Sequence, residues 1–204
     1  MDINDINLRV KRAYKTINER YENDINSALK VNLNQKGKIF SVTFGNHDDA
    51  ELHNIVFNQI SAIASFKDHL KNYLKKNNKD PQIIEDAINN NLELQLIVDL
   101  WNQDKHGSPL SRPSRSNKNP KIKGLKQGLT IKDISKGKGT ITFSPISLDR
   151  PDSMKNMTAE VDNTIVKVIG DVVDEKENKL MTLDEMIDRS LTIWEKIIRD
   201  NGIA

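Results

Sequence analysis

Apolar residues recur at intervals of three and four along the first part of the chain, a pattern typical of an amphipathic helix. The apolar positions are Ile3, Ile6, Val10, Ala13, Ile17, Tyr21, Ile25 and Ala28. We therefore expect one long helix over residues 3–29. The spacing is close to a heptad repeat over residues 3–17, so this helix could pack on its own chain or on a second copy in a dimer.

Two further helices are predicted over residues 49–75 and 81–105. Asp48 and Glu51 have the spacing of a capping box ahead of the first helix. The Asp-Pro pair at residues 80–81 suits the start of the second helix, because aspartate caps a helix well and proline is favoured at the first helical position. The apolar pattern of the second helix then continues without interruption.

Alternation of apolar and polar residues predicts strands in three other parts of the chain. Residues 38–44, KIFSVTF, predict a short strand. Residues 129–131 and 141–143 flank a glycine-containing turn at residues 135–139, which is a strand, turn and strand arrangement. Residues 163–173 are rich in Val and Ile on both faces, so we expect them at the centre of an antiparallel meander.

The last predicted helix, residues 182–201, has the clearest start signal. Thr182 and Glu185 form the pattern of a capping box, and Met181 and Met186 have the spacing of a hydrophobic staple. The expected fold class is therefore α+β. It combines a helical bundle, of three N-terminal helices and one C-terminal helix, with an antiparallel β-meander inserted before the last helix.

A single domain over residues 1–204 is expected from the length of the chain. It would consist of a mainly helical part over residues 1–106, a basic loop over 107–124, the β-meander over 125–175 and the returning helix over 182–201.

Composition excludes several classes of protein and site. The sequence has no cysteine, which rules out disulfides, thiol nucleophiles and thiolate metal sites. No segment approaches the ~20 consecutive apolar residues of a membrane span, and the N-terminus lacks the pattern of a signal peptide. We expect a cytoplasmic protein without a membrane segment. Loops that cradle phosphates and the HExxH motif are also missing, so no metal site and no cofactor are expected.

The net charge of +2 conceals a strongly basic window over residues 105–138. This window contains one acid and ten basic residues, so it carries +9 and the remaining residues carry −7. Its lysines that we expect to contact nucleic acid are Lys105, Lys118, Lys121, Lys123 and Lys126. The window could bind a phosphate-rich partner, or it could be a loop that docks onto the acidic surface of its own chain.

The predicted helix before this window combines an apolar surface with a stripe of polar side chains. Its apolar residues point in nearly every direction, which is typical of a buried helix. The polar residues Gln95, Asp99, Asn102, Gln103 and His106 share one stripe. A buried carboxylate needs a partner. We expect Asp99 to pair with Arg112, Arg115 or a cation of another helix, either as a structural link to the loop or to hold an arginine beside His106.

His106 is the candidate catalytic residue, because histidine changes its protonation near neutral pH and can act as a general acid or base. Asn102, one turn earlier, could orient the imidazole or a scissile phosphate. The structural alternatives are that His106 stabilises the C-terminal end of its helix and that Asn102 caps a carbonyl or bridges helices.

The tract DLWNQDKHG at residues 99–107 resembles the HEPN superfamily. These are small helical proteins, many of them dimeric, metal-independent ribonucleases of toxin–antitoxin, phage-defence and RNA-processing systems. The resemblance covers mainly the second and third predicted helices, and it implies His106 as the catalytic histidine with Asn102 as its polar companion. The tract is also similar to one in bacterial proteins for which it implies no activity.

Catalytic members of that superfamily carry an arginine upstream of the histidine on the same helix. Residues 98–101 of this chain read Val-Asp-Leu-Trp instead. Either Arg112 or Arg115 takes the place of that arginine from the following loop, or the chain is a non-catalytic relative.

Two functions are therefore open. The first is a protein, expected as a homodimer or with a partner protein, that engages RNA or another phosphate-bearing ligand. If it is an enzyme, it would be a metal-independent endoribonuclease of a defence or toxin–antitoxin system, with His106 moving a proton and an arginine stabilising the phosphorane. The alternative is a non-catalytic interaction protein, in which Asp99, Asn102 and His106 form a buried structural network.

Overall fold

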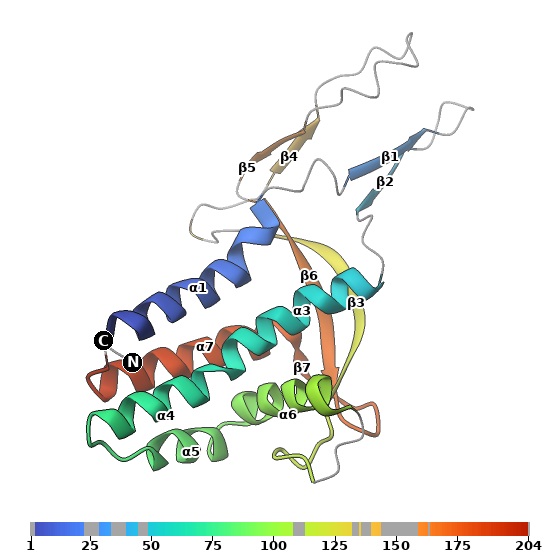
Figure 1. Ribbon diagram of the computed structural model, residues 1–204. Coiled ribbons are helices and arrows are strands. Elements are labelled where there is room, and N and C mark those ends of the chain that lie inside the picture. Colours follow the sequence, from blue (N-terminus) through green and yellow to red (C-terminus); the bar gives the residue numbers. More distant parts are fainter. Residues whose placement is uncertain are drawn as a thin grey trace. The chain divides into compact units, whose positions relative to one another are not determined.

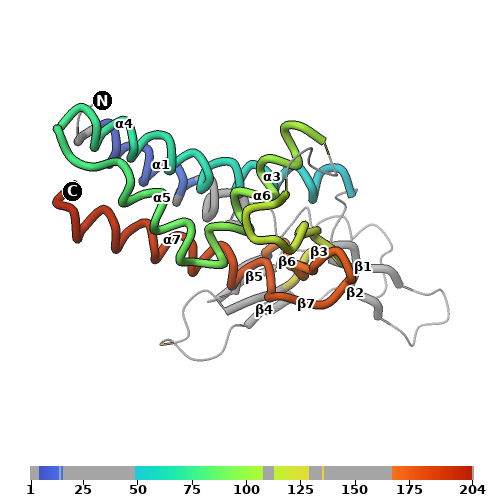
Figure 2. Tube along the Cα trace, turned by 90° about the horizontal axis from the view of Figure 1, so that it is seen from below, coloured from blue at the N-terminus to red at the C-terminus, as the bar shows by residue number. Residues whose placement is uncertain are grey.

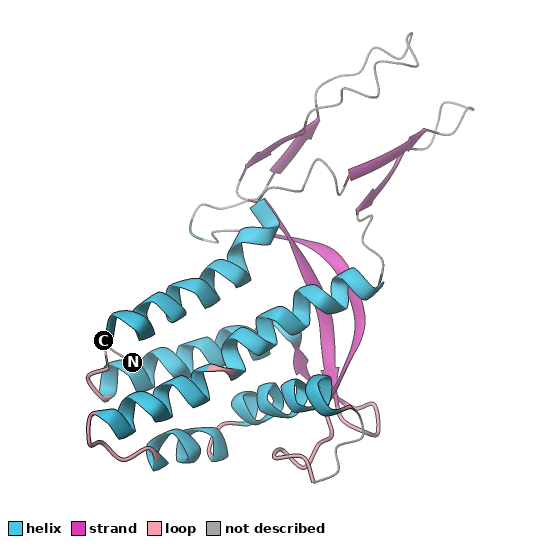
Figure 3. Cartoon of the chain, in the orientation of Figure 1, coloured by secondary structure: helices cyan, strands magenta, loops and turns pink. Residues whose placement is uncertain are grey.

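The structure, a computed structural model, describes residues 3–22, 29–33, 40–44, 49–107, 113–131, 135, 140–143, 159–162 and 164–203. Its fold class is α+β, as expected, with an antiparallel sheet ahead of the last helix (Figures 1 and 3). The helices are α1 (Ile3–Glu22), α3 (Asp49–Ala64), α4 (Phe66–Lys76), α5 (Gln82–Asn89), α6 (Leu92–His106) and α7 (Leu183–Asp200). The strands are β1 (Leu29–Leu33), β2 (Phe40–Phe44), β3 (Lys121–Ile131), β4 (Thr140–Phe143), β5 (Ala159–Asp162), β6 (Thr164–Val173) and β7 (Lys179–Thr182).

The chain divides into two compact units. Unit 1 comprises residues 1–17, 49–125 and 169–204, and unit 2 comprises residues 18–48 and 126–168. The division falls within α1, β3 and β6. The single domain expected from the sequence stays a prediction.

Unit 1 is built around α6, which contacts α3, α5 and α7. In Figure 2, α5 and α6 lie between α7 and the line formed by α3 and α4. The core consists of apolar side chains that these helices turn toward one another. Those of α3 to α7 with no more than 1% exposure are Val56, Ile60, Ile63, Ala64, Leu70, Leu74, Ile84, Ile88, Leu94, Leu96, Ile97, Leu100, Leu183 and Met186.

Both central helices are interrupted where the sequence predicted continuity. The expected helix over residues 49–75 divides at Ser65, whose hydroxyl donates to the Ala62 carbonyl over 2.8 Å. Such side-chain bonds to the backbone bend helices. The helix expected over residues 81–105 divides at Asn91, which is extended (φ −130°, ψ 115°) and donates from its side chain to the Ala87 carbonyl over 2.6 Å. Asparagine competes in this way with backbone hydrogen bonds, which ends α5.

The strands confirm some expectations and correct others. β6 is central in the sheet order β3-β6-β7 and pairs antiparallel with β7, as expected. β4 does not follow β3 in that sheet but pairs antiparallel with β5. Leu29 begins β1, so the first helix does not extend that far, and β1 pairs antiparallel with the predicted strand, observed as β2.

The predicted start of the last helix is confirmed. The Thr182 hydroxyl accepts from the Glu185 backbone N–H over 3.3 Å, and the Glu185 carboxylate accepts from the Thr182 backbone N–H over 3.0 Å. Met181 and Met186 are both buried. The Asp48 half of the other predicted capping box lies outside the described residues. No helix in the described part of the chain is both long enough and apolar enough to cross a membrane.

Candidate functional site

Asp99 is fully sequestered on the buried helix α6, with 1% of its surface exposed. Its carboxylate accepts from the Arg115 backbone N–H over 2.6 Å, from the Ser116 backbone N–H over 2.8 Å and from the Ser116 hydroxyl over 2.6 Å. The expected partner of Asp99 was the side chain of Arg112 or Arg115, or a cation of another helix. The structure instead satisfies the carboxylate with two consecutive backbone N–H groups and a hydroxyl, which can stabilise a buried charge without a cation.

The segment that Asp99 holds, residues 113–119, has no regular secondary structure and is called here the anchored segment. Ser114 accepts from the Asn117 N–H through its carbonyl over 3.0 Å and from the Asn119 N–H through its hydroxyl over 3.1 Å. Asn117 and Asn119 have left-handed φ values of 56° and 46°, which asparagine tolerates better than most residues. The segment is therefore a fixed turn. The expected basic loop over residues 107–124 also ends earlier than predicted, because β3 begins at Lys121.

The Arg115 side chain points to α5. Its guanidinium donates to the Asn89 side-chain oxygen from Nη2 over 2.8 Å and from Nε over 3.1 Å, and it forms an ion pair with Glu85. Lys71 of α4 pairs with the same carboxylate. Partial burial raises the pKa of Glu85, but hydrogen bonds from Lys71 and Arg115, together with their charges, outweigh it and lower the pKa. The Arg115 side chain therefore links the anchored segment to α5, which Lys71 joins to α4 through Glu85, and it does not support His106.

His106 lies at the last turn of α6 and is exposed, whereas Asn102 is half-buried. Neither side chain hydrogen-bonds another described residue. The predicted polar stripe thus separates into a sealed end at Asp99 and an open end at His106. Arg112, the other arginine expected beside His106, lies outside the described residues.

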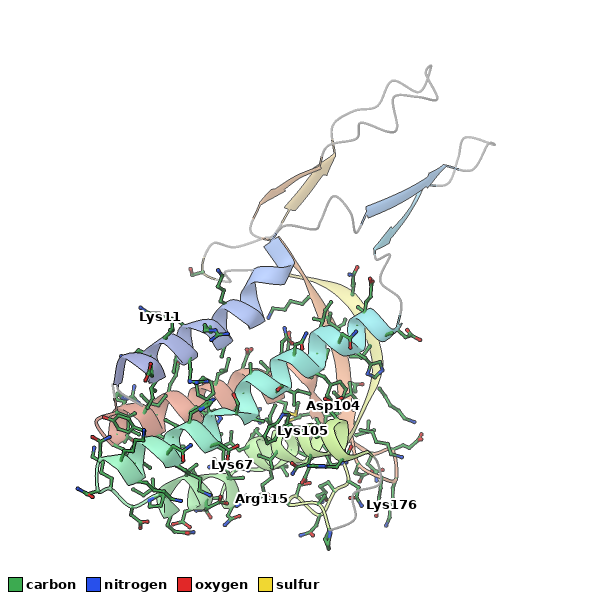
Figure 4. All side chains as sticks on the ribbon, in the orientation of Figure 1. Lys11, Lys67, Asp104, Lys105, Arg115 and Lys176 are labelled. Atoms are coloured by element: carbon green, nitrogen blue, oxygen red, sulfur yellow. The ribbon has the colours of Figure 1, made fainter. Side chains whose placement is uncertain are left out.

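A cluster that the sequence analysis missed surrounds Trp101 on α6. The Lys105 ammonium lies 3.7 Å from the centre of the indole ring, and the Lys67 ammonium of α4 lies 5.8 Å from it. Figure 4 shows these two lysines reaching out from their separate helices. We call Lys67, Trp101 and Lys105 the Trp101 cluster. Its signal in the sequence was the spacing of four residues between Trp101 and Lys105, which places the two side chains together on a helix.

The basic window is partly neutralised by an acidic turn at residues 174–177. Lys123 forms an ion pair with Glu177, and its hydrogen bond and charge lower the pKa of Glu177. The Asn119 side chain donates to the Glu175 carboxylate over 2.9 Å. Lys123 is therefore a residue of the basic window that docks onto an acid of the protein itself. The other lysines expected to bind nucleic acid, Lys105, Lys118, Lys121 and Lys126, are exposed.

Metal ligands do not gather within the described ranges, where no three histidine or carboxylate side chains come close enough to hold an ion. His53 stacks on Phe57 one turn later on α3, with ring centres 6.0 Å apart.

Comparisons with protein families, with curated proteins and with solved structures found no match for this chain.

Proposed function

We propose that this protein binds RNA at the C-terminal end of α6 without cleaving it. The observation that carries the proposal is the Trp101 cluster, in which two lysines from different helices flank one indole ring. Single-stranded RNA is held by this combination, because bases stack on aromatic rings while cations contact the phosphates.

The energies of the two contacts favour a stacked base over the Lys105 ammonium on the Trp101 ring. A cation–π contact at an exposed site contributes about 0.5–1 kcal/mol, whereas stacking of a base on an aromatic side chain contributes about 1–3 kcal/mol. A base that stacks on Trp101 therefore displaces Lys105, whose ammonium then contacts the neighbouring phosphate.

The charges available to RNA are fewer than the sequence predicted. Arg115 and Lys123 are paired with Glu85 and Glu177. Exposed Lys118 and Lys121 belong to the same unit as the Trp101 cluster, where their charges lower the pKa of Asp174 and Glu177 respectively. Electrostatic binding of this kind weakens steeply with salt.

The test is the affinity for a fluorescent single-stranded RNA, measured by anisotropy at several salt concentrations. The double variant Lys67→Gln with Lys105→Gln should bind about tenfold more weakly than wild type. Its slope of log affinity against log salt should be shallower by about 1.4, because each neutralised phosphate of a single strand contributes about 0.7.

The matched control is Lys75→Gln with Lys196→Gln, which removes two exposed lysines of α4 and α7 outside the Trp101 cluster. It should bind within about twofold of the wild type, since distant charges are largely screened by salt. Equal affinities of the two double variants, or wild-type binding that does not depend on salt, would reject the proposal. Thermal unfolding of each variant shows that its fold is retained.

A second candidate is a metal-independent ribonuclease of the HEPN type, favoured by the exposed position of His106 one turn beyond Asn102. His106 would take the proton of the 2′-hydroxyl or protonate the leaving oxygen, and Arg112 would stabilise the charge of the phosphorane. A homodimer and a role in defence or toxin–antitoxin systems belong to this candidate.

Cleavage of RNA with chelator present tests this activity. His106→Ala should lose at least about 100-fold in rate, the range that a general acid or base contributes. His53→Ala, which changes an exposed histidine of α3, should keep the wild-type rate. Activity that is equal in the two variants, or no cleavage by wild type, excludes the ribonuclease and leaves the binding proposal standing.

A further inference from the structure

We propose that a cavity between α1, α3 and α4 binds a small phosphate-bearing ligand, independently of RNA. The cavity has a volume of about 170 Å³ and lies within unit 1. Its polar lining consists of Arg9 and Arg12 from α1 and His69 from α4. Nothing in the sequence motifs marks this site, because its two halves lie far apart along the chain.

Small side chains create the cavity. Ala13, Ala62 and Ser65 line it and extend no further than a methyl or hydroxymethyl group. Ser65 lies at the junction of α3 and α4, and its hydroxyl is turned to the Ala62 carbonyl over 2.8 Å. Phe66, which is 3% exposed, provides an apolar wall. The hollow is thus built into the packing of α1 on α3 and α4.

The charge of the lining favours an anion. Arg9 and Arg12 are three residues apart on α1 and so lie on neighbouring positions of one helix face. No acid is among the described residues that line the cavity. Asp5 and Asp68 are not among the lining residues, although the charge of Asp68 acts on His69.

His69 holds Arg9 in place. The Arg9 Nη1 donates to the His69 Nε2 over 2.8 Å, which requires an unprotonated Nε2. Burial of the imidazole and the Arg9 charge lower the pKa of His69, against the opposing effect of Asp68, and the lowered pKa favours the neutral ring. A neutral imidazole adds no charge to the cavity. It orients the guanidinium while leaving the other N–H groups of Arg9 for a ligand.

A compact phosphate group matches this lining. Guanidinium groups bind oxyanions through paired hydrogen bonds, and Arg9 and Arg12 bring two such groups to the lining of the cavity. The volume is below the roughly 300–1,000 Å³ of ordinary ligand pockets, so the ligand carries only a few atoms beyond its phosphate. Pre-orientation of Arg9 reduces the entropy lost on binding.

The experiment is titration of the full chain with inorganic phosphate and with glycerol 3-phosphate, at constant ionic strength, followed through histidine imidazole signals by NMR. The His69 signals, assigned with a His69→Gln variant, should shift saturably, whereas those of exposed His53 should not. Acetate in place of phosphate tests selectivity for phosphate over carboxylate, and it should shift the His69 signals at least tenfold less effectively.

The variant Arg9→Gln with Arg12→Gln should bind both phosphates at least tenfold more weakly. Arg12→Gln alone provides a second reading if the double variant unfolds. The control is Lys11→Gln, which changes an exposed lysine that does not line the cavity and that Figure 4 shows on α1. Equal binding by the arginine and lysine variants, or no shift of His69 in wild type at ~10 mM phosphate, would overturn the proposal.

Discussion

A single buried carboxylate determines the course of a segment that has no regular secondary structure. Asp99 receives three hydrogen bonds from Arg115 and Ser116, two of them from the backbone. Hydrogen bonds to a charged group contribute more than neutral ones, and an unmatched buried group is costly. Asp99, which the sequence offered as a candidate site residue, therefore lies where its carboxylate stabilises the fold.

Replacement of Asp99 by asparagine should lower the free energy of unfolding by about 2–3 kcal/mol, because an amide has one acceptor oxygen and turns its own N–H groups toward the donors of the anchored segment. Urea denaturation measures the loss. Asp104→Asn, on the exposed side of the same helix, should change it by less than about 0.5 kcal/mol. Similar values for the two variants would show that the three hydrogen bonds do not hold the segment.

Elements of unit 1 are joined by a network centred on Glu85. This carboxylate of α5 pairs with Lys71 of α4 and with Arg115 of the anchored segment, and Arg115 also binds Asn89. These contacts tie together the two short helices that follow the break at Ser65. At this scale the basic residue Arg115 acts as a link between elements, which explains why its charge is absent from the proposed RNA surface.

Stability should therefore depend on pH through Glu85. Its pKa in the folded state is lowered from the usual value of 4.5, so its contribution is complete above that value and is lost as the pH falls through the folded pKa. Glu85→Gln should cost about 1 kcal/mol at pH 7, a modest value because water screens these partly exposed pairs. The difference from wild type should shrink in urea denaturation at about pH 3.5.

Asp86→Asn, an exposed change on the same helix, provides the control for this pH dependence. A difference between wild type and Glu85→Gln that remains constant on acidification would mean that the ion pairs do not stabilise the fold.

For the whole molecule, the distribution of charge matters more than its total. The window over residues 105–138 carries +9 in a chain of net charge +2. Part of this charge is matched within the protein by Glu85 and Glu177. The exposed lysines of this window, together with Arg9 and Arg12 at the α1 cavity, are the positive groups placed to meet phosphate-bearing ligands.

Local patterns in the sequence predicted the α+β class, the capping box of α7 and the central position of β6. They also identified Asp99 as a carboxylate that needed a partner. These predictions succeeded because periodicity, capping and the cost of a buried charge depend on residues a few positions apart or on one residue's surroundings. The prediction of one uninterrupted helix through Asn91 was wrong, because the asparagine side chain competes with the backbone for a carbonyl.

Only the tertiary structure decided which groups meet. It gave Asp99 the backbone of a segment 16 and 17 residues further on, placed Lys67 near Trp101, and brought Arg9 to His69 across 60 residues. Helical spacing could have paired Trp101 with Lys105, but no local rule pairs side chains of separate helices. The sequence by itself determined the elements and the need for partners. The packing of distant segments determined the partners, because burial and long-range contacts are properties of the folded chain.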